Sequence, residues 1–245
     1  MPGNIIAVDG FSSTGKSTLA SKLAEHYNFY YLNSGLMYRI ISHFALNNDC
    51  IINNMIKESQ LINQLDNLNF DWMIDNKGNR SLSFDGKIFG EEMYSFEISD
   101  VVSSVAKLES VRKFLFTQQK NLVIEKSVVV EGRDIGTVVF PEAEIKFFII
   151  ASVEVRAKRR KLELQNIGET ISLKDLRRDI KARDKHDSER SHSPLKKAIN
   201  AIQIDTTEMN IDEQVNSMIK NVNINSSRTG CISILNKICL LYTSP

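Results

Sequence analysis

Residues 5–17 read Ile-Ile-Ala-Val-Asp-Gly-Phe-Ser-Ser-Thr-Gly-Lys-Ser, and this stretch decides the fold. Its first four residues form a short apolar run rich in β-branched side chains, which is typical of a buried strand. The glycines at 10 and 15, followed by Lys16 and Ser17, fit the spacing G-x-x-x-x-G-K-[ST]. Apolar residues then recur at helical spacing. A strand, a glycine-bearing loop and a helix in this order predict a phosphate-binding P-loop.

Each residue type in this loop has a physical role in holding phosphate. Gly10 and Gly15 permit backbone conformations that a side chain would block, so the loop N–H groups can turn inward. The helix N-terminus adds unpaired N–H groups and the positive end of its dipole. Lys16 supplies a mobile cation for the β- and γ-phosphates, and Ser17 offers a hydroxyl to Mg²⁺. An ordinary glycine turn is the alternative, and the motif alone does not separate a kinase from a switch or a motor.

The composition is that of an ordinary globular protein, with 245 residues, 42% of them hydrophobic and 25% charged. The formal net charge of +1 favours neither nucleic-acid nor membrane binding. The cysteines at 50, 231 and 239 are too few and too scattered for a disulfide framework or a zinc site, which fits a reducing, cytosolic compartment. We expect no signal peptide, and no apolar run approaches the ~20 residues of a membrane span.

Apolar strands and amphipathic helices alternate along the chain, which predicts an α/β fold. We expect core strands at 5–8, 29–32, 127–130, 145–150 and 201–205. We expect helices at 18–28, from Ser34 (which would cap its helix) through Phe44, and at 51–65, 95–122, 152–168, 173–190 and 211–222. Between 67 and 89 the apolar period changes to two, and Asp85-Gly86 is a hairpin signal. This segment predicts a small antiparallel β unit inserted into the α/β chain.

The end of the chain differs from the rest in pattern. Residues 223–245 carry two of the three cysteines and show no clear helical or strand period. We expect these residues to form a disordered extension, or to be sequence that is not native to the protein.

Three further segments carry charged residues in suggestive positions. The run Glu131 to Thr137 follows a predicted buried strand, where open α/β sheets bind ligands, although a solvated loop is the alternative. Arg156 and Arg160 share one helix face in a basic run that could equally be a solvated surface. Arg183, Asp187 and Arg190 also share a helix face, and a structural ion-pair ladder would look the same.

Several separate stretches together resemble the bacterial cytidylate kinases, which are nucleoside monophosphate kinases. They agree with that family in order and spacing from about residue 4 to 222, and the Gly-Arg-Asp-x-Gly-Thr-Val-Val-Phe-Pro stretch is highly specific to it. The stretches are Gly10 to Thr18, Asn33 to Arg39, Val111-Arg112, Gly132 to Pro141 and Arg183 to Arg190.

The resemblance implies a three-layer P-loop fold with a five-stranded parallel core sheet. It also implies an inserted antiparallel β monophosphate-binding region and a short helical lid. The expected boundaries are a kinase domain at 1–222, with its core at 1–34, 108–155 and 190–222, the monophosphate-binding region at about 35–107 including the β insertion at 67–89, and the lid at about 155–170.

The resemblance also implies roles for individual residues. Lys16, Arg133, Arg183 and Arg190 would be catalytic. The ATP and its phosphates would be bound by Gly10, Phe11, Ser12, Ser13, Thr14, Gly15, Lys16, Ser17 and Thr18, with Arg156 stacking on adenine and Arg160 reaching the phosphates. CMP would be bound by Ser34, Arg39, Ser103, Arg112, Arg133, Asp134, Arg183, Asp187 and Arg190. ATP and CMP or dCMP would be the substrates, Mg²⁺ the metal at Ser17, and the protein a cytoplasmic monomer without nucleic-acid or membrane partners.

Elementary chemistry agrees with these expectations. Transfer between two nucleotides brings about six negative charges together, and catalysis is mostly positioning and charge stabilisation. Guanidinium groups match phosphate oxygens bidentately. A carboxylate such as Asp134 can accept from the cytosine N4 amine, and Arg112 can donate to the acceptors of the base, whereas uracil would present an acceptor to Asp134. We therefore expect CMP to be preferred over UMP by roughly 1 to 3 kcal/mol or more.

This chain departs from the usual family pattern at four positions: Phe11 and Ser13 where Pro and Gly are usual, Asn33 for Asp, and Tyr94 near a usual Arg. Three other readings stay open. One is a P-loop kinase for another monophosphate such as UMP, which a substrate panel would distinguish. Another is a non-catalytic nucleotide-binding module of the GTPase type, which would need an Asn-Lys-x-Asp stretch that this sequence lacks. The third is a nucleic-acid-binding ATPase, which the near-zero net charge disfavours.

Overall fold

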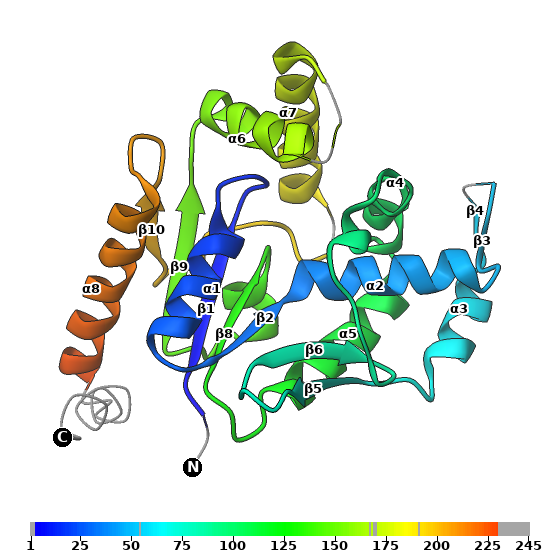
Figure 1. Ribbon diagram of the computed structural model, residues 1–245, viewed down its shortest axis with the longest axis horizontal. Coiled ribbons are helices and arrows are strands. Elements are labelled where there is room, and N and C mark those ends of the chain that lie inside the picture. Colours follow the sequence, from blue (N-terminus) through cyan, green and yellow to red (C-terminus); the bar gives the residue numbers. More distant parts are fainter. Residues whose placement is uncertain (1–2, 54, 167, 169–170, 191, 230–245) are drawn as a thin grey trace. The chain divides into compact units, whose positions relative to one another are not determined.

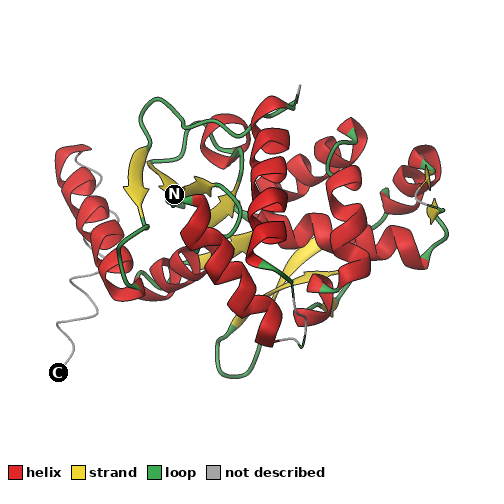
Figure 2. Ribbon diagram, turned by 90° about the horizontal axis from the view of Figure 1, so that it is seen from above, coloured by secondary structure: helices red, strands yellow, loops and turns green. Residues whose placement is uncertain are grey.

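A computed structural model describes residues 3–53, 55–166, 168, 171–190 and 192–229. The chain divides into two compact units, which are described separately. The first, called the sheet unit below, is formed by Asn4–Tyr31 and the chain from Ser127 onward. The second, the insert unit, is formed chiefly by Leu32–Lys126. Figure 2 shows how helices and strands are connected by loops along the chain.

A five-stranded sheet has the strand order β10-β9-β1-β8-β2. Its strands are β1 (Ile5–Gly10), β2 (Tyr30–Asn33), β8 (Val128–Gly132), β9 (Ile145–Ile150) and β10 (Ile202–Asp205). The central strand β1 pairs in parallel with β8 on one side and β9 on the other, and β9 pairs in parallel with β10. Every residue of β8 is buried, which explains its unbroken apolar start. The predicted α/β fold with a five-stranded parallel core sheet is confirmed.

The described residues of the sheet unit form four α-helices (Figure 1). They are α1 (Lys16–His26), α6 (Val153–Asn166), α7 (Leu173–Glu189) and α8 (Ile211–Thr229). Helices α1 and α8 pack on one face of the sheet through apolar residues four apart, because such residues lie on one side of a helix. The fully buried members of this core include Ile6, Val8, Leu19, Leu23, Met218 and Val222. This packing holds the loop between β1 and α1 in place.

The insert unit combines helices with two small antiparallel sheets. Its helices are α2 (Ser34–Asn47), α3 (Glu58–Leu65), α4 (Phe96–Val105), α5 (Glu109–Leu122) and the short 3₁₀ turn η1 (Glu91–Tyr94). One sheet pairs β3 (Ile51–Ile52) with β4 (Met55–Ile56), and the other orders β5 (Phe70–Ile74), β6 (Arg80–Phe84) and β7 (Lys87–Ile88). The predicted β unit at 67–89 is confirmed by the second sheet.

Three local predictions were wrong. The first half of the predicted helix at 51–65 is a hairpin, because Asn53 adopts a φ of 49° and reverses the chain. Helix α2 is capped by Asn33 instead of Ser34: the Asn33 side-chain oxygen accepts the Leu36 N–H at 2.9 Å. Helix α8 continues past its predicted end at residue 222 to Thr229. The expectation of disorder therefore does not hold for residues 223–229, whereas the alternative that the tail is not native sequence stays a prediction. Residues 230–245 lie outside the described residues.

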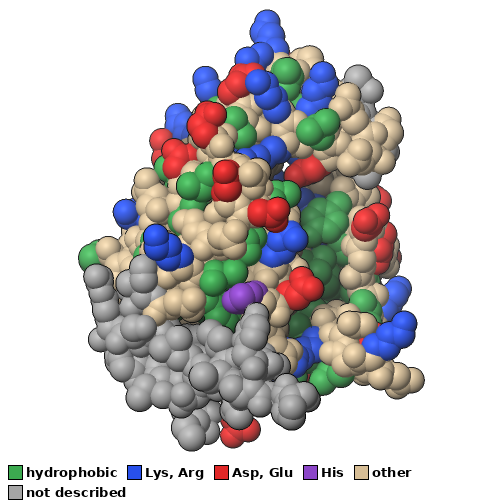
Figure 3. Space-filling view, turned by 60° about the vertical axis from the view of Figure 1, so that its left-hand side comes forward, with side chains coloured by type: hydrophobic (Ala, Val, Ile, Leu, Met, Phe, Trp, Pro, Cys, Tyr) green, Lys and Arg blue, Asp and Glu red, His purple; other side chains and the backbone are tan. Residues whose placement is uncertain are grey.

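The surface carries charges of both signs. Figure 3 shows acidic and basic side chains mixed at the top of the view, where α6 and α7 lie. Within the described part of the chain, no helix is both long enough and apolar enough to cross a membrane.

Candidate active site

The carboxyl ends of parallel strands meet at one edge of the sheet, and the loops that follow them carry the candidate residues. In the sheet unit, β1 leads into the phosphate loop at residues 11–15, and β8 leads into a segment that begins with Arg133. β9 leads into α6, and β10 ends beside Thr206. The phosphate loop, the start of α6 and Arg133 of the 131–137 run therefore lie at this edge.

The phosphate loop requires glycine at two positions for different reasons. A side chain at Gly10 would collide with the carbonyl oxygen of Ile149 on the neighbouring strand. Gly15 has a φ of 87°, in the left-handed region, and directly precedes α1. Ser13 also lies in the left-handed region, with a φ of 58°, although it carries a side chain. The loop closes on itself through a bond from the Thr14 hydroxyl to the Phe11 carbonyl at 3.0 Å.

Lys16 is buried at the start of α1, with its ammonium group donating to the Phe11 carbonyl at 3.2 Å. The pKa of Lys16 is lowered to about 7, chiefly by burial of the ammonium group and also by the nearby positive charge of Arg133. Glu131 and Asp187 oppose this effect, while Arg183 adds to it. Arg133 and Arg183 both act electrostatically on Lys16, and a group of cations that influence one another in this way favours binding of a polyphosphate.

Glu131 is a site residue that sequence reasoning did not single out. It lies in β8 directly before Gly132 and is 2% exposed, and its carboxylate accepts the Ser17 hydroxyl at 3.0 Å. The other carboxylate oxygen accepts the Tyr31 hydroxyl at 2.6 Å. The sequence contained a signal for this role. Glu131 ends an apolar strand that is expected to be buried, and burying a carboxylate is costly unless it has a polar partner.

Asp9 is a second buried carboxylate that the sequence analysis missed. Its two oxygens accept the backbone N–H groups of Ile135, at 2.9 Å, and Gly136, at 2.7 Å. Burial raises the pKa of Asp9 to about 6, although these two backbone hydrogen bonds partly oppose the shift. Asp9 therefore anchors a single π-helical turn, Ile135–Val139, and with it the preceding Arg133 and Asp134.

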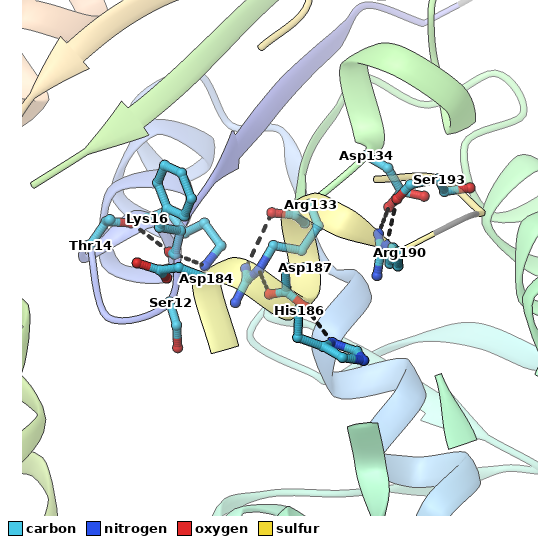
Figure 4. A network of polar contacts seen from close by, with 12 residues as sticks. Ser12, Thr14, Lys16, Arg133, Asp134, Asp184, His186, Asp187, Arg190 and Ser193 are labelled. Carbon is cyan, nitrogen blue, oxygen red and sulfur yellow. Dashed lines mark hydrogen bonds and ion pairs between the residues drawn. The ribbon is translucent and has the colours of Figure 1, made fainter. Parts of the chain in front are cut away.

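Two ion pairs join the segment after β8 to α7 and the residue after it (Figure 4). The Arg133 Nε donates to the Asp187 carboxylate at 3.0 Å, and an Arg190 Nη lies 3.7 Å from the Asp134 carboxylate. Burial by itself would raise the pKa of Asp187, but the guanidinium groups of Arg133, Arg183 and Arg190 hold the pKa below its ordinary value. Asp187 is therefore ionised and acts only as a hydrogen-bond acceptor near neutral pH.

The arginines of α6 differ sharply in their surroundings. Arg156 is 3% exposed and forms two hydrogen bonds to Asp184, at 2.9 and 2.7 Å. Arg159, which the sequence analysis did not choose, donates to the Thr14 carbonyl at 3.0 Å and to the Thr206 carbonyl at 2.8 Å. Arg160 instead pairs with Glu163 on the same helix at 3.0 Å. In this state Arg159, not Arg160, is the one of these two that contacts the phosphate loop.

The remaining predicted residues belong to the insert unit. Arg39 on α2 donates to the Met93 carbonyl and the Ser99 hydroxyl, both at 3.1 Å. Arg112 on α5 lies over the Tyr38 ring at 5.7 Å. Ser103 on α4 is exposed and Ser34, at the start of α2, is buried. Helices α2, α4 and α5 pack together, which brings these side chains into one unit.

The sequence model of the cytidylate kinase family matches residues 6–224 of this chain. The chain belongs to the cytidylate kinase family. It is 40% identical to the cytidylate kinase of Flavobacterium johnsoniae over 219 residues, which cover 89% of this chain and 95% of that relative. It is 41% identical to the cytidylate kinase of Alkaliphilus oremlandii over 214 residues, which cover 87% of this chain and 95% of that relative.

Each of the four residues that we noted as departures from the cytidylate kinase pattern either makes a specific contact or adopts an uncommon backbone conformation. Ser13 adopts the left-handed backbone, and Asn33 caps α2. The Tyr94 ring lies under the Arg39 guanidinium at 4.7 Å, and the Phe11 ring lies under the Arg156 guanidinium at 5.4 Å. At two of the departures, Tyr94 and Phe11, an aromatic ring thus lies against an arginine of the predicted site.

Proposed function

We propose that this protein transfers the γ-phosphoryl group of ATP to CMP or dCMP, forming ADP and CDP or dCDP by direct in-line displacement. The observation that supports the proposal is that the phosphate loop with Lys16 and the segment that begins with Arg133 follow two paired neighbouring strands, and that Arg133 binds Asp187 on α7, the helix that carries Arg183. Phosphoryl transfer requires such a set of cations, since it depends mostly on positioning and on neutralising charge. Membership of the cytidylate kinase family supports CMP as the acceptor. We expect the reaction to take place in the cytoplasm and the protein to be a monomer.

The donor side would be formed by the phosphate loop. Its backbone N–H groups and Lys16 would hold the β- and γ-phosphates of ATP, while the Lys16–Phe11 contact would be exchanged for contact with phosphate. The Arg159 contacts with Thr14 and Thr206 would keep the loop joined to the end of β10 during this exchange.

Mg²⁺ fits the oxygen groups next to the loop. The Ser17 hydroxyl and the Glu131 carboxylate lie within hydrogen-bond distance of each other, and Mg²⁺ usually takes only one or two protein oxygens beside phosphate and water. Among the described residues there is no cluster of three His, Cys, Asp or Glu side chains that could hold a metal by protein groups alone. When bound, the ion would neutralise charge that develops on the phosphate oxygens.

The acceptor phosphate would be bound by Arg133, Arg183 and Arg190. Arg133 and Arg190 are paired with Asp187 and Asp134, so an incoming phosphate would compete with carboxylates for them. Asp187 would then accept from the sugar hydroxyls, which its ionised state permits. Arg39 would also contribute to phosphate binding.

Cytosine would be recognised by Asp134, and we expect Ser103 and Arg112 to contribute to recognition of the base as well. Asp134 would accept from the N4 amine of cytosine, and Arg112 would donate to the ring acceptors. Uracil would place an oxygen opposite the Asp134 carboxylate and leave both acceptors unpaired. A difference of about 1 to 3 kcal/mol follows, which is roughly a 5- to 150-fold preference for CMP.

An ADP-release assay with ATP, Mg²⁺ and each of CMP, dCMP, UMP, AMP and GMP tests this proposal. We expect turnover with CMP or dCMP, at least fivefold lower kcat/KM with UMP, and none without Mg²⁺. The variant Asp134→Asn, whose amide can donate, should narrow the difference between CMP and UMP. Higher turnover of UMP than CMP by the wild type would favour a UMP-directed kinase. Absence of turnover in a folded protein would reject the enzymatic assignment.

A further inference from the structure

Arg156 is nearly fully buried, and its guanidinium donates hydrogen bonds to three different parts of the sheet unit. Its Nε donates to the Ala151 carbonyl at 3.0 Å, between β9 and α6. One Nη donates to the phosphate-loop carbonyl of Ser12 at 3.3 Å, and both Nη groups bind the Asp184 carboxylate on α7. Figure 4 shows Asp184 beside the phosphate-loop residues Ser12 and Lys16. A single guanidinium thus joins the phosphate loop to α7.

The planar face of the same guanidinium also makes a contact, with an aromatic ring. It lies over the Phe11 ring at 5.4 Å, and the Phe11 ring meets Phe148 of β9 edge to face at 5.9 Å between centroids. The phosphate loop therefore contacts Arg156 through the Phe11 ring as well as through the Ser12 carbonyl.

Asp184 is well placed to set the orientation of α7. It directly follows Arg183 and precedes Asp187 by three positions, so Asp184 and Asp187 lie on neighbouring positions of one helix face. A bidentate bond at Asp184 restrains rotation of α7 about its axis, and this restraint determines where Asp187 and Arg183 point. Asp187 in turn contacts Arg133.

We propose that Arg156 and Asp184 form a positioning pair that couples the phosphate loop to the acceptor-side residues of α7. The pair acts through Ser12 and Phe11 on the donor side and through Arg183 and Asp187 on the acceptor side. This inference rests on the proposed function for the identity of the acceptor, but the coupling itself is a property of the loop and the helix. It also gives Arg156 a role that does not depend on contact with adenine.

The chain provides a matched control for this pair. Arg177 on α7 donates to Glu154 on α6 at 2.8 Å, so it joins the same two helices. Both side chains of this control pair are 43% exposed, and Arg177 makes its other bond to the Leu173 carbonyl of its own helix. A role that consists only of holding α6 against α7 would be shared by the two pairs.

The test compares Arg156→Lys and Asp184→Asn with Arg177→Lys and Glu154→Gln. Inorganic tripolyphosphate binding, measured by calorimetry, reports on the phosphate loop without any base or acceptor. The KM for CMP reports on the acceptor side. We expect Asp184→Asn, a change on α7, to weaken tripolyphosphate binding at least fivefold, and Arg156→Lys to raise the KM for CMP at least fivefold. The control variants should change each quantity less than twofold.

A further variant addresses the chance that changes in a buried ion pair prevent folding. Phe11→Leu removes only the ring under Arg156 and leaves both charges paired, and we expect it to weaken tripolyphosphate binding about two- to fivefold. Variants of Arg156 and Asp184 that melt at lower temperature but keep wild-type tripolyphosphate affinity and KM would overturn the proposal, as would control variants with equal effects. If wild type binds tripolyphosphate but does not turn over CMP, the proposed function fails while the coupling is still tested by Asp184→Asn.

Discussion

At the scale of a residue, Lys16 is a buried ammonium group whose pKa is lowered both by burial and by neighbouring arginines. Its pKa is lowered to about 7 in the free protein, because the ammonium group is buried beside arginines. Bound phosphate favours the charged form and must raise this pKa again. Ligand binding above pH 7 is therefore coupled to uptake of a proton by Lys16.

We predict that tripolyphosphate affinity falls by up to about tenfold per pH unit between pH 7.5 and 9, as protons become scarcer. Calorimetry at pH 8.5 in two buffers of different ionisation enthalpy should show net proton uptake on binding. The variant Lys16→Met should bind more weakly and show no uptake. Equal heats in both buffers for the wild type would contradict the assigned pKa.

Ser13 adopts a left-handed backbone, which costs a residue with a side chain roughly 1 to 2 kcal/mol. Glycine avoids this cost but loses more entropy on folding, by about 0.5 to 1 kcal/mol. We predict that Ser13→Gly raises the free energy of unfolding by about 0.5 kcal/mol in urea titrations. Ser12, which is not at a positive φ, serves as the control, and Ser12→Gly should destabilise by about 0.5 to 1 kcal/mol. Equal losses in both variants would show that Ser13 is not strained.

At the scale of an element, the start of α2 depends on Asn33. Its side chain caps the helix by accepting the Leu36 N–H. We predict that Asn33→Ala lowers the free energy of unfolding by about 1 kcal/mol, because a helix N–H loses its partner. Asn33→Asp, which keeps a side-chain oxygen acceptor, should stay within about 0.5 kcal/mol of wild type. An unchanged midpoint for the alanine variant would reject the cap.

The turn at Ile135–Val139 is an element that depends on a distant side chain. Asp9 supplies both hydrogen bonds to its first two N–H groups, from a strand on the other side of a long insertion. We predict that Asp9→Ala destabilises the protein by about 2 kcal/mol or more, since two buried N–H groups lose their acceptor. Its effect on kcat should exceed its effect on the KM for ATP, because the turn carries Arg133 and Asp134. A normal kcat for Asp9→Ala would show that the turn at Ile135–Val139 keeps its conformation without Asp9.

At the scale of the whole molecule, a ligand that binds the folded chain must raise the free energy of unfolding. CMP at 100 times its dissociation constant should raise the free energy of unfolding by about 2.7 kcal/mol, because it binds only the folded chain. Thermal unfolding with CMP and UMP at equal concentration measures the preference without catalysis, and we predict the larger shift with CMP. Asp134→Asn should reduce the difference between the two shifts. Identical shifts for both nucleotides in the wild type would contradict recognition of the N4 amine.

Local patterns in the sequence were sufficient for the fold. The apolar runs that became β1, β8 and β9, the spacing of the phosphate loop and the period-two segment at 67–89 all predicted their elements correctly. These signals depend on neighbouring residues, because burial on one face imposes a period of two or 3.6 on the chain. Two predictions failed where the conformation or hydrogen bond of one residue decided the local structure. Asn53 adopts a positive φ that reverses the chain, and Asn33 caps α2 in place of Ser34.

The sequence by itself determined that this is a P-loop protein of α/β architecture with a parallel sheet, a β insertion and an arginine-rich site. Only the tertiary structure decided which polar and charged groups meet. Asp9 and Gly136 are 127 positions apart, Ser17 and Glu131 are 114 apart, and Arg156 and Asp184 are 28 apart. No local period encodes such pairs, and Arg159 could not be told from Arg160 until α6 was packed against the loop. Each buried charge must find a partner, but the packing of the sheet and its helices selects which one.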